Sequence, residues 1–310
     1  MNVALILFEL AHHSQLRGEV WGEEIDALAM RRALLRRADV TRCDILTINT
    51  YLALRDARAT TSYDLAIHFF DPSISIPGAL NVLYFQQFYD IERHDLRRLC
   101  REYDRVFTPA RAIATEHDDV ELLPLAVDCD YYKPLTVADE AYRSDTVFIG
   151  NAHIRDTSTY IDYLTPLLHS NLAIYGSRWD LPMYAAWRKR WRGVLPIEKA
   201  AHAYAGASVA LSIHNQRYLK DLGFATTRPL HSLACGRATV SDTNAELARL
   251  LPPDASGLRH TSTAKQFQRA VAELVADPVL CTELGSIGRT YVMQYHSWDV
   301  RLGELFNSLP

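Results

Sequence analysis

The chain has 310 residues, of which 48% are hydrophobic and 23% are charged, and its formal net charge at pH 7 is −4. This composition is that of a globular protein with a sizeable core, and at roughly 100–200 residues per domain the length indicates two domains or one large one. The negative net charge argues against a global attraction to nucleic acid or to an anionic membrane. An anionic ligand must therefore be held by a local group of cations.

Cysteine usage and hydropathy indicate a cytoplasmic protein. The five cysteines are scattered and include no Cys-X-X-Cys pair, so reduced thiols are expected and no metal site is predicted. No run approaches the roughly 18 consecutive apolar residues of a membrane span. The apolar start, Met1 to Leu10, lacks a basic leader and is interpreted as a first strand rather than a signal peptide. At most a peripheral membrane contact is expected.

Short apolar runs typical of strands alternate with helical patterns along the first half of the chain. Strands are expected at residues 3–8, 44–48, 64–69, 81–85, 105–108 and 121–125, and helices at 21–37 and 90–101. The pattern loosens from Asp130 to Ser144, which indicates a connector.

The alternation restarts after this connector. Strands are expected at residues 146–149, 172–175, 209–213 and 238–241, and helices at 157–169, 196–205, 227–234 and over much of 264–309. Alternation of this kind predicts α/β architecture with parallel sheets. We expect two Rossmann-like domains, residues 1–130 and 145–290, facing a cleft, with a helix in 291–310 that packs back on the first domain. The cleft would be the default ligand site.

Several segments of the second half carry a resemblance to a known family. They are Leu172–Trp179, Trp191–Pro196, Ala210–Asn215, Thr226–Ala238 and Tyr295–Arg301. In this order and spacing they resemble the group-1 glycosyltransferases, in particular the bacterial branch that includes spore-maturation-type enzymes. The resemblance covers roughly Asp145 to Leu305. It implies a GT-B fold, a nucleotide-sugar donor on the second domain, and a glycan, lipid-linked or protein acceptor on the first. No nucleic-acid partner and no cofactor are expected.

The chain departs from the family at one position. His231 stands where the family usually has a glutamate that accepts hydrogen bonds from the ribose hydroxyls. A neutral imidazole accepts through one ring nitrogen and cannot act as a bidentate carboxylate. This substitution keeps open the interpretation of a non-catalytic protein that binds glycan or nucleotide. A GT-B-type nucleotide-sugar epimerase, which needs no acceptor, is a separate alternative.

Cations and helix-terminal amides are the candidates for binding the donor diphosphate without a metal. Arg228 and Thr227 begin the helix that leads to Gly236, and Arg155 follows the strand and turn that end at Gly150. A guanidinium fork and helix N-terminal amides both suit phosphate oxygens. The alternative for Arg228 is a surface or hinge salt bridge, and for Arg155 it is a solvated loop arginine.

Four further residues at strand ends are candidates for the donor site. Gly176 and Trp179 follow one strand, where the indole could stack on the base or pack in the core. His214 and Asn215 follow another strand, where a histidine satisfied by backbone groups is the alternative.

The first half offers candidates for a catalytic base. They are Asp71 and His68 after the strand at 64–69, and Glu9 after the first strand. An inverting enzyme would need such a base. The resemblance instead favours a retaining, metal-independent reaction, in which the leaving phosphate takes the acceptor proton. The alternative for each candidate is an ordinary polar loop residue.

Overall fold

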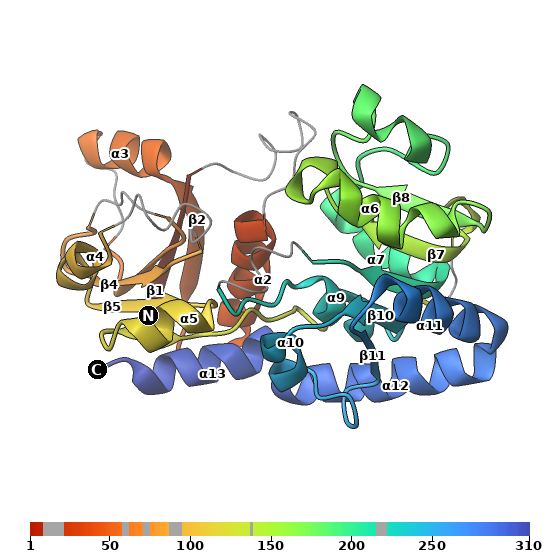
Figure 1. Ribbon diagram of the computed structural model, residues 1–310. Helices are drawn as coiled ribbons and strands as arrows, with labels where there is room; N and C mark the ends of the chain where they lie inside the picture. The colour runs from red at the N-terminus through yellow and green to blue at the C-terminus, as the bar shows by residue number, and fades with distance from the viewer. Residues whose placement is uncertain (9–21, 58–61, 71–74, 87–94, 137–138, 215–221) are drawn as a thin grey trace. The chain divides into compact units, whose positions relative to one another are not determined.

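The computed structural model describes residues 1–8, 22–57, 62–70, 75–86, 95–136, 139–214 and 222–310 (Figure 1). The chain divides into two compact units. Unit 1 comprises Met1–Asp128 together with Trp298–Pro310, and unit 2 comprises Cys129–Ser297. All five cysteines are free thiols. Within the described ranges, no helix has the length and apolar character needed to cross a membrane.

Unit 1 is built on a six-stranded parallel sheet with the strand order β2-β1-β3-β4-β5-β6. Its strands are β1 (Asn2–Leu7), β2 (Arg42–Thr47), β3 (Leu65–His68), β4 (Leu80–Tyr84), β5 (Arg105–Thr108) and β6 (Val120–Leu122). Its helices are α2 (Gly22–Arg36), α3 (Ile48–Asp56), α4 (Leu96–Glu102), α5 (Arg111–Glu116) and α13 (Trp298–Ser308). The run Val3–Leu7 is buried throughout, as expected for a central strand covered on both faces.

The last helix of the chain completes unit 1 (Figure 1). The backbone amide of Trp298 donates to the carbonyl of Val127 at 3.0 Å, and its buried indole meets Tyr84 edge-on. Arg36 of α2 donates twice to the carboxylate of Asp299, at 3.0 and 2.7 Å. The chain end is therefore joined to α2 and to the core of the first unit.

Unit 2 is built on a five-stranded parallel sheet with the order β11-β10-β9-β7-β8. Its strands are β7 (Ser144–Ile149), β8 (Leu172–Tyr175), β9 (Ala207–Ser212), β10 (Ala238–Asp242) and β11 (Leu258–Thr261). Its α-helices are α6 (Thr157–Tyr163), α7 (Ala200–Ala205), α9 (Arg228–Ala234), α10 (Ala245–Leu250), α11 (Ala264–Ala276) and α12 (Pro278–Tyr295). Short 3₁₀ turns cover Glu140–Tyr142, Ala152–Ile154, Thr165–Leu167, Pro182–Trp187 and Ile197–Lys199.

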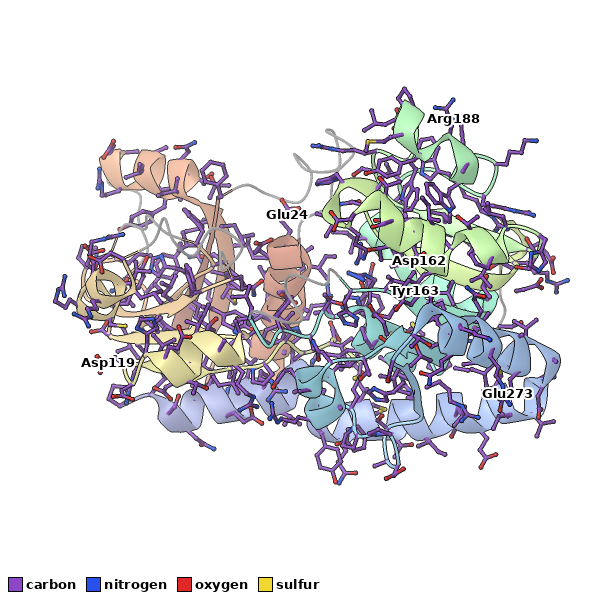
Figure 2. All side chains as sticks on the ribbon, viewed as in Figure 1. Glu24, Asp119, Asp162, Tyr163, Arg188 and Glu273 are labelled. Atoms are coloured by element: carbon purple, nitrogen blue, oxygen red, sulfur yellow. The ribbon has the colours of Figure 1, made fainter. Side chains whose placement is uncertain are left out.

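An aromatic cluster fills one side of this second core. Phe148, Tyr160, Trp179, Tyr184 and Trp187 are all buried and pack at ring-centroid distances of 4.8 to 6.3 Å. Nearby, Tyr163 at the end of α6, labelled in Figure 2, packs on Phe267 of α11 with ring centroids 5.1 Å apart. The cluster supports the turns that follow β7 and β8.

The two parallel sheets flanked by helices confirm the predicted α/β class with two Rossmann-like folds. The helix expected at 157–169 is shorter than predicted. It ends at Tyr163 and is followed by a 3₁₀ turn with Pro166 near its start. Proline has no amide hydrogen to donate and so cannot continue the α-helical ladder.

Candidate functional site

The turns after β7 and β8 approach each other closely at the carboxyl edge of the unit 2 sheet. The amide of Gly150 donates to the carbonyl of Tyr175 at 2.8 Å. Gly176 has φ of +136°, and a Cβ atom there would lie 2.2 Å from the carbonyl oxygen of Gly150. Both features require glycine at position 176. The carboxyl edge of a parallel sheet is where α/β proteins bind ligands.

Trp179 supports this turn from inside the core. Its side chain is fully buried, and its Nε1 donates to the carbonyl of Gly150 at 2.8 Å. Phe148 and Tyr160 pack against the indole, at centroid distances of 6.1 and 4.8 Å. The structure therefore places Trp179 among core aromatic residues, with no exposed face for a base to stack on.

Arg155 is almost completely buried beside the same turn. Its side chain is 4% exposed, and its Nε donates to the carbonyl of Ile213, the residue after β9, at 2.5 Å. Its Cζ lies 5.3 Å from the centre of the Phe148 ring. Its Nη2 is buried and has no hydrogen-bond partner among the described residues. A buried cationic nitrogen without a partner carries a large desolvation cost, which a bound anion would offset.

Arg228, the first residue of α9, shares the same carbonyl. Its Nη1 donates to Ile213 at 2.8 Å, and its Cζ lies 6.0 Å from the Phe148 ring centre. Burial, and next the charge of Arg155, lower the pKa of Arg228 to about 9, so it remains charged at neutral pH. In the described part of the chain, neither arginine forms an ion pair with a carboxylate. Two neighbouring guanidinium groups that no described carboxylate pairs with suit an anion.

Thr227 and His231 belong to the same helix. Thr227 precedes α9, and its carbonyl accepts from the amide of His231 at 2.9 Å, while its side chain makes no capping bond. His231 is buried and stacks flat on Tyr132, with ring centroids 4.0 Å apart and planes 6° apart. Burial, and next the charge of Arg228, lower the pKa of His231 to about 3, so the ring is neutral.

His214 and Asp242 form a buried pair at the ends of β9 and β10. The Nδ1 atom of His214 lies 2.7 Å from Oδ1 of Asp242, and the backbone amide of His214 donates to both carboxylate oxygens. Sequence reasoning missed Asp242. Its position as the charged last residue of a fully buried strand is the signal that could have found it. Asn215 lies outside the described residues.

Of the three catalytic candidates in unit 1, the structure describes one, His68. His68 is fully buried at the end of β3, with Nε2 3.1 Å from Oδ1 of Asn81. Burial lowers the pKa of His68 to about 4. Asp71 and Glu9 lie outside the described residues. Across the described ranges, no three His, Cys, Asp or Glu side chains are grouped to hold a metal ion.

Comparisons with known proteins agree with this architecture. Residues 159–307 match the sequence model of the family described as Glycosyl transferase-like. No curated protein matches in sequence. Sucrose-phosphate synthase from Thermosynechococcus elongatus aligns with 14% identity and a TM-score of 0.68, over 99% of this chain and 98% of that chain.

Two further solved structures are similar. HepE of Anabaena, in complex with UDP and glucose, aligns with 10% identity and a TM-score of 0.67 over 100% of both chains. An alpha-glucosyltransferase in complex with UDP and a 13-mer DNA aligns with 13% identity and a TM-score of 0.70, over 99% of this chain and 98% of that chain.

The two parallel sheets and these shared folds show the GT-B fold. Residues 159–307 are similar to a glycosyltransferase family, in agreement with the resemblance found in the sequence.

Proposed function

We propose that the protein transfers a sugar from a uridine diphosphate sugar to a hydroxyl group of a glycan, lipid-linked or protein acceptor. The observation that supports a diphosphate donor is the pair Arg155 and Arg228, two cations fixed on the carbonyl of Ile213. Uridine is the base we favour because HepE and the alpha-glucosyltransferase, which share the fold, were solved with UDP. We do not propose a nucleic-acid acceptor, since the net charge of −4 gives no general attraction to a phosphate backbone.

In this proposal unit 2 holds the donor and unit 1 supplies the acceptor side. The bond between the anomeric carbon and the phosphate oxygen breaks, its electron pair passes to the diphosphate, and the acceptor oxygen bonds to the anomeric carbon. Preorganised cations stabilise such a leaving group, and the two arginines perform this role in place of a metal ion. The acceptor proton passes to the leaving phosphate oxygen on the same face, so the anomeric configuration is retained.

Ligand-induced stabilisation tests the donor assignment. The melting temperature of the protein is measured with a panel of nucleoside diphosphates and nucleotide-sugars in the presence of a chelator. A ligand at about 100 times its dissociation constant adds about 2.7 kcal/mol of stability. We expect UDP and at least one UDP-sugar to stabilise the protein with the chelator present. Stabilisation that requires a divalent ion would overturn metal independence, and no response to any uridine nucleotide would overturn the donor.

A transfer assay then tests the reaction. The UDP-sugar selected by the panel is incubated with glycan, lipid-linked and peptide acceptors, with a DNA duplex as a further arm. We expect UDP release to depend on an acceptor and a glycosylated product to retain the donor's anomeric configuration. Interconversion of the free nucleotide-sugar without an acceptor would indicate an epimerase. Transfer to the duplex would contradict the proposed acceptor class.

A further inference from the structure

The pair His214 and Asp242 provides a hydrogen-bond acceptor, which the binding of a diphosphate does not require. Asp242 accepts from the backbone amide of His214 at 3.0 and 3.1 Å and lies 2.7 Å from its Nδ1. A carboxylate oxygen accepts hydrogen bonds, so the ring proton resides on Nδ1. This tautomer leaves Nε2 of His214 as a lone-pair acceptor.

That acceptor has no donor among the residues that the structure describes. Nε2 of His214 is buried and has no hydrogen-bond partner within the described ranges, and the residue as a whole has no exposed surface. Burial lowers the pKa of the imidazole, Asp242 opposes that shift, and the charges of Arg228 and Arg155 add to the lowering. The ring therefore stays neutral and keeps its lone pair. Buried polar atoms in native proteins are nearly always paired, so this one indicates a missing donor.

A second buried polar atom without a described hydrogen-bond partner lies at the same edge of the sheet. Arg155 is bonded through Nε to the carbonyl of Ile213, the residue just before His214, and its buried Nη2 also has no described partner. One atom is a donor and the other is an acceptor. A phosphate oxygen could satisfy Arg155, but it has no proton to give to His214. The ligand must therefore bring a hydroxyl as well as an anion.

We propose that Nε2 of His214 accepts a hydrogen bond from a sugar hydroxyl of the bound nucleotide-sugar, and that Asp242 is the positioning residue that fixes the tautomer. The inference rests on the proposed function and adds a residue that recognises a hydroxyl. The hydroxyl belongs either to the ribose or to the transferred sugar, and both present the same chemistry.

Calorimetry with UDP and with UDP-glucose distinguishes the two sources. One neutral hydrogen bond corresponds to roughly 2- to 13-fold in affinity, so His214→Ala should weaken binding by that factor. Loss with both ligands assigns the ribose, and loss with UDP-glucose alone assigns the transferred sugar. His214→Gln, whose amide oxygen can accept, should recover part of the loss. His260→Ala is the matched control, because both ring nitrogens of His260 are already bonded, to Thr243 and Leu251.

Asp242→Asn tests the positioning role. It should weaken binding by a similar factor, and the double variant with His214→Ala should lose little more than His214→Ala, since the two residues act as one unit. A nitrogen NMR spectrum of His214 should show a protonated Nδ1 and an unprotonated Nε2 whose resonance moves when UDP-glucose is added. A merely structural pair would alter stability without moving that resonance.

The outcomes separate the two proposals. If the parent protein binds UDP-glucose and His214→Ala binds it equally tightly, the role of His214 is wrong and the donor assignment stands. An Nε2 resonance unchanged at saturation has the same meaning. If the parent protein binds neither UDP nor UDP-glucose, the donor assignment fails and the inference fails with it.

Discussion

The imidazole of His231 lies flat on the phenol ring of Tyr132, with planes 6° apart and centroids 4.0 Å apart. Tyr132 is 2% exposed and belongs to the segment that the sequence predicts as a connector. The stack fixes the plane of the histidine at the position where the sequence resemblance implies a glutamate. It also keeps this imidazole out of water and beside the charge of Arg228, which explains its low pKa.

This burial predicts loss of stability in acid. The pKa of His231 is about 3 in the folded protein and 6.5 ordinarily, so between these values the unfolded chain binds a proton that the folded chain does not. Above pH 6.5 the ring is neutral in both states, and the free energy of unfolding does not depend on this group. As the pH falls from 6.5 toward 3, the unfolded chain gains the proton and the free energy of unfolding falls. One such proton lowers the free energy of unfolding by about 1.4 kcal/mol per pH unit. His231→Phe, which keeps a ring on Tyr132, should flatten the dependence measured by urea unfolding. Equal slopes in the two proteins would contradict this assignment.

The sequence predicted the edge of the sheet where the candidate site lies. Gly150, Gly176, Arg155 and His214 all follow strands, and the carboxyl ends of parallel strands meet at one edge. Glycine at 176 is required because two turns touch there. Both features follow from backbone geometry, so the pattern of strands along the sequence was sufficient to predict them.

The contacts within the site were less predictable. The oxygen shared by the two arginines is a backbone carbonyl, that of Ile213, and every residue has one, so no side-chain pattern marks it. Trp179 could be assigned either to the base or to the core, because an indole suits both and only packing decides. The stack of Tyr132 on His231 joins segments far apart in sequence, and local spacing carries no information about it.

The close approach of Gly176 and Gly150 predicts a specific sensitivity to an added methyl group. Gly176→Ala would place Cβ 2.2 Å from a backbone oxygen and would also strain a φ of +136°. Gly193 is a matched control, with φ of +93° and nothing within 4 Å of its Cβ position. Strain of this kind alone costs about 1–3 kcal/mol. Gly176→Ala should therefore lower the free energy of unfolding clearly more than Gly193→Ala. Equal losses would show that the turns can separate freely.

Gly150→Ala should affect binding more than stability. Its Cβ would lie 3.0 Å from Cζ of Phe148 and 3.4 Å from Nη1 of Arg155, and both are the ends of side chains that can shift. Phe148 is the ring over which both guanidinium groups lie, so the shift should move the cations. We expect weaker binding of UDP by calorimetry with a melting temperature near that of the parent. Unchanged affinity would mean that the ring does not position the arginines.

The arginine pair gives the last prediction. A hydrogen bond to a charged group contributes about 1.5–3 kcal/mol, so Arg228→Ala should weaken UDP binding by roughly 10- to 150-fold. Arg155→Lys should also weaken it, because a lysine is a point charge and cannot hold the carbonyl of Ile213 and a phosphate oxygen with one planar fork. Calorimetry with UDP in a chelating buffer measures both variants.

Arg188→Ala is the control for the loss of one positive charge from the same unit. Arg188 is exposed and is labelled in Figure 2, and among the described hydrogen bonds its side chain donates to the backbone carbonyl of Asp180. The Arg188→Ala variant should bind UDP as tightly as the parent protein, because a surface charge contributes little at moderate salt. If Arg188→Ala and Arg228→Ala weaken binding equally, the effect is one of net charge. If Arg228→Ala binds as tightly as the parent, the diphosphate does not lie on this pair.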